Sequence, residues 1–448
     1  MDGGAGFLAE AVRAAAVTRE VAVGAGALRS ITFAAMLVPE RRRLTVVADS
    51  NTFAAAGKAT DEILRASVPS VTPPIVLPGS PRLKPDVGLA RDLANRLGES
   101  AVAVAVGSGV VNDLVKYAAA LARRPYLCVA TAASMDGYAA SGAALLDGGF
   151  KRTFDCPPPL AVVADLDVVA KAPPEMASWG YGDLAGKVVA GADWMLADAL
   201  GEDAINPGPF AMVQERLTGW LADPAGLRRG DRTALEGLMS GLLVSGFAMQ
   251  AHGNSRPASG SDHQFAHLWE MEGLSLHGER LSHGVCVGIG CVVMLALYEW
   301  LLARAQPLAD IDAALAAQPD WAASERRVRA AFAEPALAER ALAEMTAKRR
   351  DRARLRRRLE RFVEIWPSLR ERLAARLPRS AAMRAALATC GAPSAPVEIG
   401  IAPAALRADI ERARMIRRRY TLLDLLADAG LLGRAIHEVF GKGTGREA

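Results

Sequence analysis

Short runs of β-branched and small apolar residues alternate with alanine-rich helical segments over the first third of the chain. Five such runs predict strands, at residues 44–49, 74–78, 101–106, 126–130 and 161–167. The run at 101–106 is apolar throughout, which is typical of a strand buried on both faces of a parallel sheet. This βαβ rhythm predicts a doubly wound α/β domain, whose ligands bind beyond the carboxyl ends of the strands.

The strand at 101–106 leads directly into a glycine turn, Gly107-Ser108-Gly109, and then into a helix. Glycines between a strand and a helix let backbone N–H groups approach a pyrophosphate at the helix N-terminus. The pattern is only part of the GxGxxG motif, because Asn112 holds the position of the third glycine. A tight strand-to-helix turn without a ligand is therefore an equal alternative.

Polar residues also follow two other predicted strands. Asp49 ends the strand at 44–49, and a carboxylate there can accept from a ribose hydroxyl and repel a 2′-phosphate, which favours NAD over NADP. Thr131, Ser134 and Asp136 follow the strand at 126–130, where they could face a nicotinamide or a substrate hydroxyl. Capping and turn roles are the alternatives, since Ser and Asp favour such positions.

Two prolines, Pro173 and Pro174, end the last predicted strand, and nearly everything after them has a helical pattern. We therefore predict an α/β domain over residues 1–172 and an all-helical domain over residues 173–448. In the first helix after the prolines, Asp183 and Lys187 are four residues apart and share a face. A surface ion pair is one interpretation, but flanking glycines and apolar neighbours leave room for a close approach.

Histidine is concentrated in one part of the chain, because four of its six histidines lie between residues 254 and 290. His263 and His267 are spaced i, i+4 and would project from one helix face, and His283 follows a Gly-containing turn. Two or more of these side chains and one distant carboxylate would give three protein ligands with a position left open for substrate. That is the arrangement of a catalytic metal site.

Composition excludes several classes of function. A net charge of +4 on 448 residues gives no reason to expect nucleic acid as a partner. The arginine-rich residues 322–384 carry interleaved acids, which favours a solvated helix face. The five scattered cysteines contain no CxxC spacing, so a reducing cytoplasm is expected. The longest apolar run, residues 285–298, is too short to span a bilayer and predicts a buried helix, so no membrane insertion is expected.

In this order, these motifs closely resemble the sn-glycerol-1-phosphate dehydrogenases. That family belongs to the superfamily of glycerol dehydrogenase, iron-containing alcohol dehydrogenases and 3-dehydroquinate synthase. The resemblance covers nearly the whole chain. It implies an N-terminal Rossmann-like α/β domain that binds NAD(P), an all-helical C-terminal domain, and an active site in the cleft between them. It rests on Asp49, residues 107–117, 134–138, 180–187 and 259–267, and the His283-Gly-Val-Cys-Val-Gly pattern.

The resemblance also assigns roles to individual residues. Asp183, His263 and His283 match the metal ligands. His267, Lys187 and Asp136 match residues that line the substrate site and carry the catalytic roles. The cofactor-binding positions are Asp49, Asn51, Gly107, Ser108, Gly109, Asp113, Thr131 and Ser134. His277 begins a similar pattern six residues before His283 and is the alternative third ligand, and Asp262 stands where the family usually has Glu.

The implied reaction is the NAD(P)H-dependent interconversion of dihydroxyacetone phosphate and sn-glycerol 1-phosphate in a cytoplasmic homo-oligomer. One divalent ion would polarise the ketone oxygen; zinc is the default for Asp/His/His, and nickel or iron is compatible. His267 would relay a proton and Lys187 would meet the substrate phosphate. The alternatives are a dehydroquinate-synthase-like cyclising lyase and a non-catalytic, arginine-rich binding protein on the same scaffold.

Overall fold

The computed structural model describes residues 3–39, 42–98, 101–148 and 150–441. The chain packs into two compact units. The first contains the residues up to Leu184, Pro207–Ala258 and Thr389–Ala392, and the second contains Ala185–Asn206, Ser259–Ala388 and the residues from Pro393 onward. Because the units interleave along the chain, packing does not decide the domain boundary predicted after residue 172, which stays a prediction.

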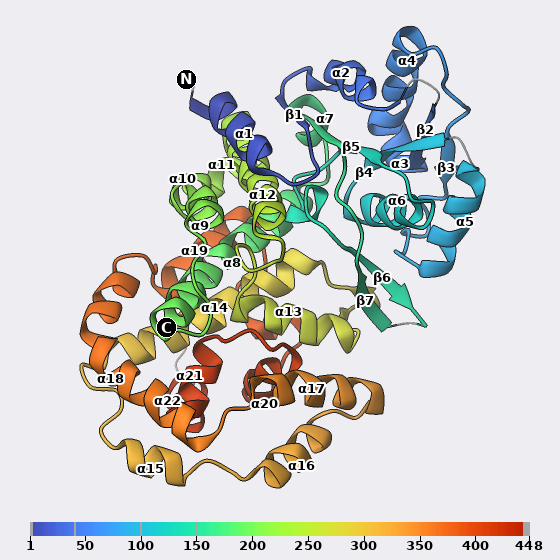
Figure 1. Ribbon diagram of the computed structural model, residues 1–448. Helices are drawn as coiled ribbons and strands as arrows, with labels where there is room; N and C mark the ends of the chain where they lie inside the picture. Colours follow the sequence, from blue (N-terminus) through green and yellow to red (C-terminus); the bar gives the residue numbers. More distant parts are fainter. Residues whose placement is uncertain (1–2, 40–41, 99–100, 149, 442–448) are drawn as a thin grey trace. The chain divides into compact units, whose positions relative to one another are not determined.

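The first unit is built on a six-stranded parallel sheet of order β1-β8-β5-β4-β2-β3 (Figure 1). All five pairings are parallel, as the βαβ rhythm predicted. The strands are β1 (Glu20–Gly24), β2 (Arg43–Asp49), β3 (Ile75–Leu77), β4 (Ala101–Gly107), β5 (Tyr126–Ala130) and β8 (Ala161–Asp165). Strand β1, at one edge, is an element that the sequence patterns did not indicate.

Helices α2 (Ile31–Met36), α3 (Ser50–Thr52), α4 (Lys58–Ser67), α5 (Val87–Leu97) and α6 (Gly109–Leu121) lie between these strands along the chain. Helix α1 (Gly3–Ala14) precedes β1, and α7 (Leu166–Val169) follows β8. After β2 the chain enters α3 directly at Ser50 and continues through a π-helical turn, Phe53–Gly57. Strands β6 (Ala143–Asp147) and β7 (Phe150–Phe154) form a separate antiparallel hairpin.

Strand β4 shows why the sheet is covered on both faces. Its valines, Val102, Val104 and Val106, belong to one core cluster with residues of α2 and α4. Successive side chains of a strand point to opposite faces, so its alanines face the other side. Helix α6 packs against β4 but contributes nothing to that cluster, which places it over the small alanines.

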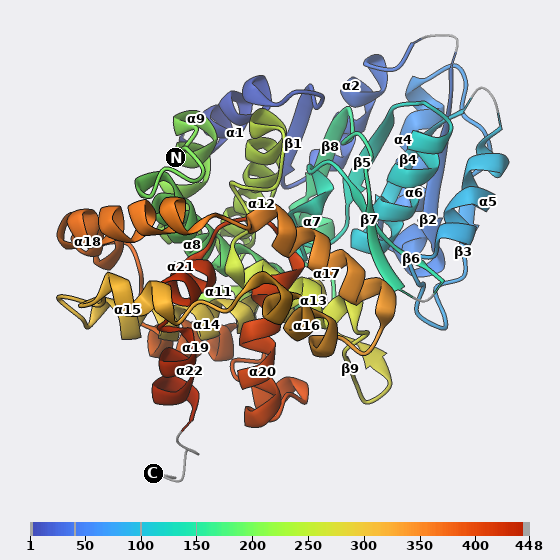
Figure 2. The ribbon, with the colours of Figure 1, turned by 60° about the horizontal axis from the view of Figure 1, so that its bottom comes forward.

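The remaining helices of the first unit are α9 (Pro207–Gln214), α10 (Leu217–Trp220), α11 (Pro224–Arg229) and α12 (Arg232–His252), and the first part of α8 (Pro174–Ala199). The second unit takes the rest of α8 and is helical apart from the short hairpin of β9 (Ser275–Leu276) and β10 (Glu279–Arg280). After α8, the helices of the second unit are α13 (Ser261–Met271), α14 (His283–Leu302), α15 (Ile311–Ala316), α16 (Trp321–Ala331), α17 (Pro335–Lys348), α18 (Arg352–Ala374), α19 (Ser380–Cys390), α20 (Pro403–Ala413), α21 (Leu422–Asp428) and α22 (Leu432–Phe440). Figure 2 shows the elements of the chain from a second direction.

Two described helices, α12 and α14, have the length and apolar composition of a membrane span. In both, most of the apolar window is buried inside the protein, 67% in α12 and 83% in α14. Core helices of folded proteins pass the same test. The prediction that residues 285–298 form a buried helix is confirmed.

Candidate active site

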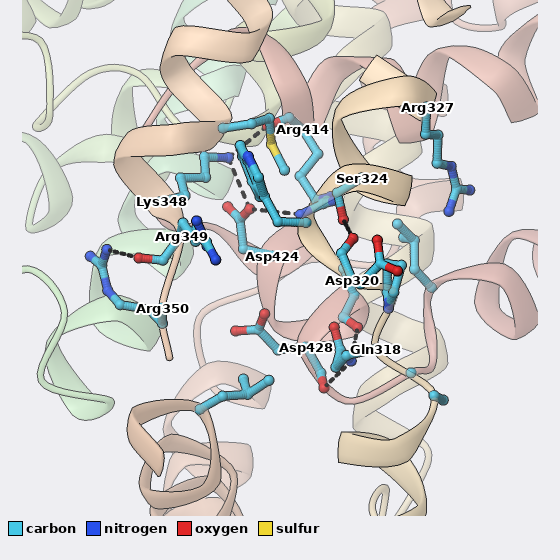
Figure 3. Close-up of a pocket in the computed structure, with 18 of the residues that line it drawn as sticks. Gln318, Asp320, Ser324, Arg327, Lys348, Arg349, Arg350, Arg414, Asp424 and Asp428 are labelled. Atoms are coloured by element: carbon cyan, nitrogen blue, oxygen red, sulfur yellow. Dashed lines mark hydrogen bonds and ion pairs between the residues drawn. The ribbon is translucent and has the colours of Figure 1, made fainter. Parts of the chain in front are cut away.

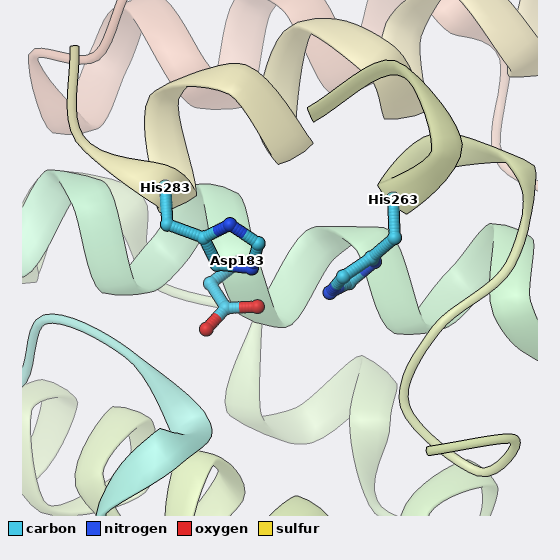
Figure 4. Close-up of side chains that lie close together, drawn as sticks. All are labelled: Asp183, His263 and His283. Atoms are coloured by element: carbon cyan, nitrogen blue, oxygen red, sulfur yellow. The ribbon is translucent and has the colours of Figure 1, made fainter. Parts of the chain in front are cut away.

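A cluster of one aspartate and two histidines is the centre of the candidate site. Asp183 on α8, His263 on α13 and His283 at the start of α14 each offer a ligand atom, and the three atoms lie within 4.8 Å of one another (Figure 4). Asp183 is fully buried and His263 is nearly so. One carboxylate and two imidazoles form a donor set that divalent zinc, iron or nickel can use, with coordination positions left open. The three residues therefore fit a divalent metal ion.

Each histidine of this cluster is held by its own carboxylate. The Asp262 carboxylate lies within hydrogen-bond distance of Nδ1 of His263, and Glu270 Oε1 lies 2.8 Å from Nδ1 of His283. Such contacts fix the ring orientation and leave Nε2 as the coordinating atom. Asp262 and Glu270 are both buried. Sequence reasoning did not give Glu270 a role, although its spacing three residues after His267 was a usable signal.

The three histidines of α13 and α14 form one group of rings. The centroid of His283 lies 5.2 Å from that of His263 and 5.8 Å from that of His267. His267 Nδ1 is 3.7 Å from Glu270. Burial, reinforced by the charge of Arg417, lowers the pKa of His267 far below its ordinary value, so this imidazole is neutral at neutral pH. It can therefore exchange protons or hydrogen bonds as a neutral ring.

His277 lies apart from this group. It occupies the turn between β9 and β10, where it is exposed and has a φ of 52°. An imidazole on an exposed hairpin tip lacks the buried carboxylate partner that His263 and His283 each have. The geometry therefore favours His283 as the third member of the cluster.

Lys187 is completely buried, so the interpretation of Asp183 and Lys187 as a surface ion pair is wrong. Burial raises the pKa of Asp262 to about 7, and the positive charge of Lys187 opposes this rise. The ammonium group therefore helps to keep the Asp262 carboxylate ionised beside His263. This position differs from the exposed one that contact with a substrate phosphate requires.

Glycines allow the helices of the second unit to approach this group. A Cβ atom on Gly186 would collide with the Asp262 carboxylate and Val287, and one on Gly290 would collide with the backbone of Asp262. Gly260, just before α13, lies against Asp193, whose carboxylate accepts from Ser261 N–H and Ser261 O–H, both at 2.7 Å. Asp193 thereby fixes the N-terminus of the helix that carries His263.

The predicted cofactor residues of the first unit meet where the strand order reverses. From β2 the chain continues to β3 on one side, whereas β4, β5 and β8 follow on the other. The register pairs Val47 with Ala105, which brings Asp49 and Gly107 to neighbouring strand ends. Ligands of open α/β sheets bind at this kind of position. The structure thus brings these two predicted residues together.

A side chain at either glycine of this turn would displace a neighbouring side chain. A Cβ atom on Gly107 would lie 2.5 Å from Val111, and one on Gly109 would lie 2.9 Å from the Met135 side chain. The turn opens α6, a helix of 13 residues, and Ser108 occupies its N-cap position without a side-chain capping bond. The backbone N–H groups at this helix start suit the phosphates of a dinucleotide.

The other predicted cofactor residues have structural contacts. Asp49 caps α3 by accepting from the backbone N–H groups of Asn51 and Thr52, and Asn51 donates to the Gly79 carbonyl at 3.2 Å. The Asp113 carboxylate accepts from Ala144 N–H at 3.2 Å. Ser134 shares a hydrogen bond with the Tyr138 hydroxyl, and Thr131 donates its N–H to the Gly107 carbonyl. The capping alternative therefore holds for Asp49, and its cofactor role stays a prediction.

Asp136 connects the loop after β5 to the Asp183 side chain of the cluster. Its backbone N–H donates to Asp183 Oδ2 at 2.9 Å, and its side chain is buried. Gly180, one turn before Asp183 on α8, has the Ala133 carbonyl directly where a Cβ atom would stand. Asp136 thus lies beside a predicted ligand, and its direct contact with Asp183 is made by the backbone.

A cavity of about 1020 Å³ lies in the second unit among α15 to α18 and α20 to α22. Two of the basic residues that line it are paired: Lys348 bonds Asp424 at 2.8 Å (Figure 3). Arg358 bonds Asp428 and Glu202. The arginine-rich stretch is thus only partly the solvated face that was predicted. Among the described residues that line this cavity, none belongs to the predicted site.

Comparison with known proteins shows which families and structures the chain is similar to. Residues 22–173 match the family model described as iron-containing alcohol dehydrogenase. The glycerol-1-phosphate dehydrogenase [NAD(P)+] of Halalkalibacterium halodurans is 33% identical over 258 residues, and that of Geobacillus stearothermophilus is 28% identical over 387 residues. Residues 22–173 are thus similar to iron-containing alcohol dehydrogenases, and the resemblance predicted from the sequence is confirmed.

The length of the aligned region differs from one relative to the next. The aligned regions cover 57% of this chain and 65% of the H. halodurans protein, and 86% of both chains for the G. stearothermophilus protein. Thus the chain spans less than two thirds of the length of the first relative. The crystal structure of glycerol dehydrogenase from Schizosaccharomyces pombe has a TM-score of 0.59 at 15% identity and covers 96% of this chain and 92% of that one. This likeness confirms the fold of an α/β N-terminal part and a helical C-terminal part.

Proposed function

We propose that the protein is a metal-dependent oxidoreductase that interconverts dihydroxyacetone phosphate and sn-glycerol 1-phosphate with NAD(P)H. The observation that carries the proposal is the cluster of Asp183, His263 and His283, with each histidine supported by a buried carboxylate. Relatives at 28–33% identity are named glycerol-1-phosphate dehydrogenases, which supports this substrate pair. The glycine turn at the sheet's switch point supports a dinucleotide cofactor.

Zinc is the proposed ion, because one carboxylate and two imidazoles with open positions suit it best. When bound, a divalent ion supplies Lewis acidity to a carbonyl oxygen, and a nicotinamide supplies the hydride. The protein's own contribution is to fix the ligands. Asp262 and Glu270 hold the imidazole rings, and the Asp136 N–H holds one oxygen of Asp183.

His267 is the proposed proton carrier. It lies beside His263 and His283, a quarter of its side chain is exposed, and it is neutral at neutral pH. A neutral imidazole can pass a proton to an alkoxide through water while its second nitrogen accepts one. We assign Lys187 to the support of Asp262, because its buried ammonium group opposes the rise in the pKa of that carboxyl.

NAD is the proposed preferred cofactor, because the Asp49 carboxylate at the end of β2 would repel a 2′-phosphate. Asp49→Ser should remove that repulsion and raise the relative kcat/KM for NADPH. Unchanged cofactor preference in this variant would argue against a cofactor role for Asp49.

We also propose a homo-oligomer in the cytoplasm. The exposed apolar side chains of Phe33 and Met36 on α2 support self-association, and the free cysteines Cys128, Cys156, Cys286, Cys291 and Cys390 support a reducing compartment. Light scattering of the purified protein should give a mass above the 47.2 kDa of one chain. A measured mass equal to that of one chain would contradict the proposed homo-oligomer.

The activity is tested by following NADH absorbance with purified, zinc-loaded protein. Dihydroxyacetone phosphate should cause net NADH oxidation, and Asp183→Asn should abolish it. A cyclising lyase recycles its cofactor and causes no net NADH oxidation, so net oxidation with dihydroxyacetone phosphate also distinguishes the dehydrogenase from that alternative. Metal-loaded protein that oxidises no NADH with dihydroxyacetone phosphate would overturn the proposal, and a chiral assay of the product checks the sn-1 configuration.

A further inference from the structure

Lys116, on α6, is a charged residue that is completely buried in the first unit. Its Nζ donates to three backbone carbonyls, those of Gly137 at 2.8 Å, Ala140 at 2.9 Å and Gly142 at 3.0 Å. Burial lowers the pKa of Lys116, and the nearby Asp113 carboxylate, 3.8 Å away, opposes this. A buried ammonium group is costly unless its three donors are satisfied, and here all three have acceptors.

Two neighbours on α6 bind the same loop. Asn112 Nδ2 donates to the Gly137 carbonyl at 3.3 Å, and the Asp113 carboxylate accepts from Ala144 N–H at 3.2 Å. Residues 137–144 are therefore fastened to α6 along their length by side chains from a single helical turn. Loop carbonyls at residues 137, 140 and 142 have no regular strand or helix partner among the described bonds, so the ammonium group takes the place of such a partner.

The start of this loop touches both the predicted metal ligand and the predicted cofactor turn. The Asp136 N–H donates to Asp183 Oδ2 at 2.9 Å, and the Met135 side chain packs against Gly109. The Gly137 carbonyl, which Lys116 and Asn112 both hold, is only one residue beyond Asp136. A shift of this carbonyl would therefore move the N–H group that orients the Asp183 carboxylate.

We propose that Lys116 is a positioning residue for the active site. It fixes residues 135–142 so that the Asp136 N–H holds one oxygen of Asp183 and leaves the other for a metal ion, while Met135 stays against the glycine turn. The role rests on the proposed function, because it requires Asp183 to be a metal ligand. Lys116 acts through the loop and touches neither the metal nor the substrate.

The test uses Co²⁺ alone as the probe, titrated into the metal-free full-length protein and followed by visible absorption. Lys116→Met keeps the length of the side chain and removes the three donors. We expect it to lower the Co²⁺ affinity about 10- to 100-fold and to alter the d–d spectrum, as changes to groups that orient metal ligands do. Unchanged affinity together with an unchanged spectrum would overturn the proposal.

Lys348→Met is the matched control. Lys348 is also a largely buried lysine that donates to a backbone carbonyl, that of Arg414 at 2.6 Å, and to a carboxylate, Asp424 at 2.8 Å. Its loss should destabilise the protein and leave Co²⁺ affinity and the spectrum as in the wild type. An equal change of the spectrum in both variants would mean that Lys116 has only a general structural role, which also overturns the proposal.

Two further measurements keep the outcome unambiguous. If Lys116→Met does not fold, the Co²⁺ spectrum of Asn112→Ala tests the proposal. A d–d spectrum altered less than is expected for Lys116→Met supports the proposal, and a wild-type spectrum overturns it. Wild-type protein that binds no Co²⁺, or that binds it equally well after Asp183→Ala, would instead overturn the metal site itself and the proposed function with it. Wild-type binding that depends on Asp183 but not on Lys116 would overturn this inference alone.

Discussion

Two charged regions of the second unit differ in how their charges are used. On α13, the buried Asp262 contacts His263, and the buried Glu270 contacts His283 of α14. Helices α16 to α18 carry many more charges, but Arg329 pairs with Glu325 and Glu339 at the surface. Arg358, bonded to Glu202 and Asp428, and Lys348, bonded to Asp424, are buried examples. Burial and the gathering of three potential ligand atoms, more than the number of charges, distinguish the candidate site.

The largest effect should come from the cluster itself. Asp183→Asn or His263→Ala removes a proposed ligand, and loss of several kcal/mol of Lewis-acid stabilisation would lower kcat/KM about 10³-fold or more. The measurement is NADH oxidation together with the metal content of the protein, with circular dichroism as a check that the fold is retained. Normal activity and normal metal content in these variants would mean that the buried cluster is no more important for the reaction than the arginine-rich helices.

His283 and His277 provide a sharper form of the same test. His283→Ala should lower activity nearly as much as His263→Ala, because His283 lies in the cluster with Glu270 on its Nδ1. His277→Ala should have little effect, because His277 is exposed in the β9–β10 turn. The measurement is kcat/KM and metal content for both variants. A larger loss in His277→Ala than in His283→Ala would identify His277 as the third ligand.

The supporting carboxylates should have an intermediate effect. Glu270→Gln weakens the contact that orients His283, and metal affinity should fall about 10- to 100-fold. Competition with a chelator of known affinity measures the change. Glu325→Gln, on an exposed pair of the arginine-rich helices, is the control and should leave metal affinity as it was. Equal losses in the two variants would contradict a specific role for Glu270.

Sequence reasoning found the cluster and missed its supports for a physical reason. His263 and His283 stood out because histidine is scarce in this chain, and Asp183 came from the family resemblance. Glu270 and Lys116 are common residue types in helical patterns, and nothing local marks them as buried. Their roles depend on partners brought close by folding, such as the carbonyls at residues 137, 140 and 142.

Arg358 should affect stability and leave catalysis unchanged. Arg358→Leu leaves Glu202 and Asp428 without their buried partner, which should cost about 3–5 kcal/mol in the free energy of unfolding. Urea denaturation measures this loss, and kcat/KM at low temperature should match the wild type. A loss of activity without a loss of stability would connect the arginine-rich helices to the reaction.

The smallest effect is expected at Arg329. Its side chain is largely exposed, and solvent screens its pairs with Glu325 and Glu339. Arg329→Leu should therefore leave the urea midpoint unchanged within error. A clear shift of the midpoint would show that the surface charges of this region contribute to stability as the buried ones do.

The sequence by itself determined the class of the fold. Strands such as β4 are recognisable because parallel strands buried on both faces are apolar throughout, and the prolines at 173 and 174 mark the change to helices. It also determined which histidines are candidates for metal binding. These signals are local, so they can be read along the chain without knowledge of distant partners.

Only the tertiary structure decided how the candidates are arranged. It brought the end of β2 beside the end of β4, buried Lys187 beside Asp262 and placed His277 on an exposed turn. It also paired each histidine of the cluster with its own carboxylate. Register, burial and long-range hydrogen bonds depend on the packing of distant segments, and no local pattern in the sequence specifies them.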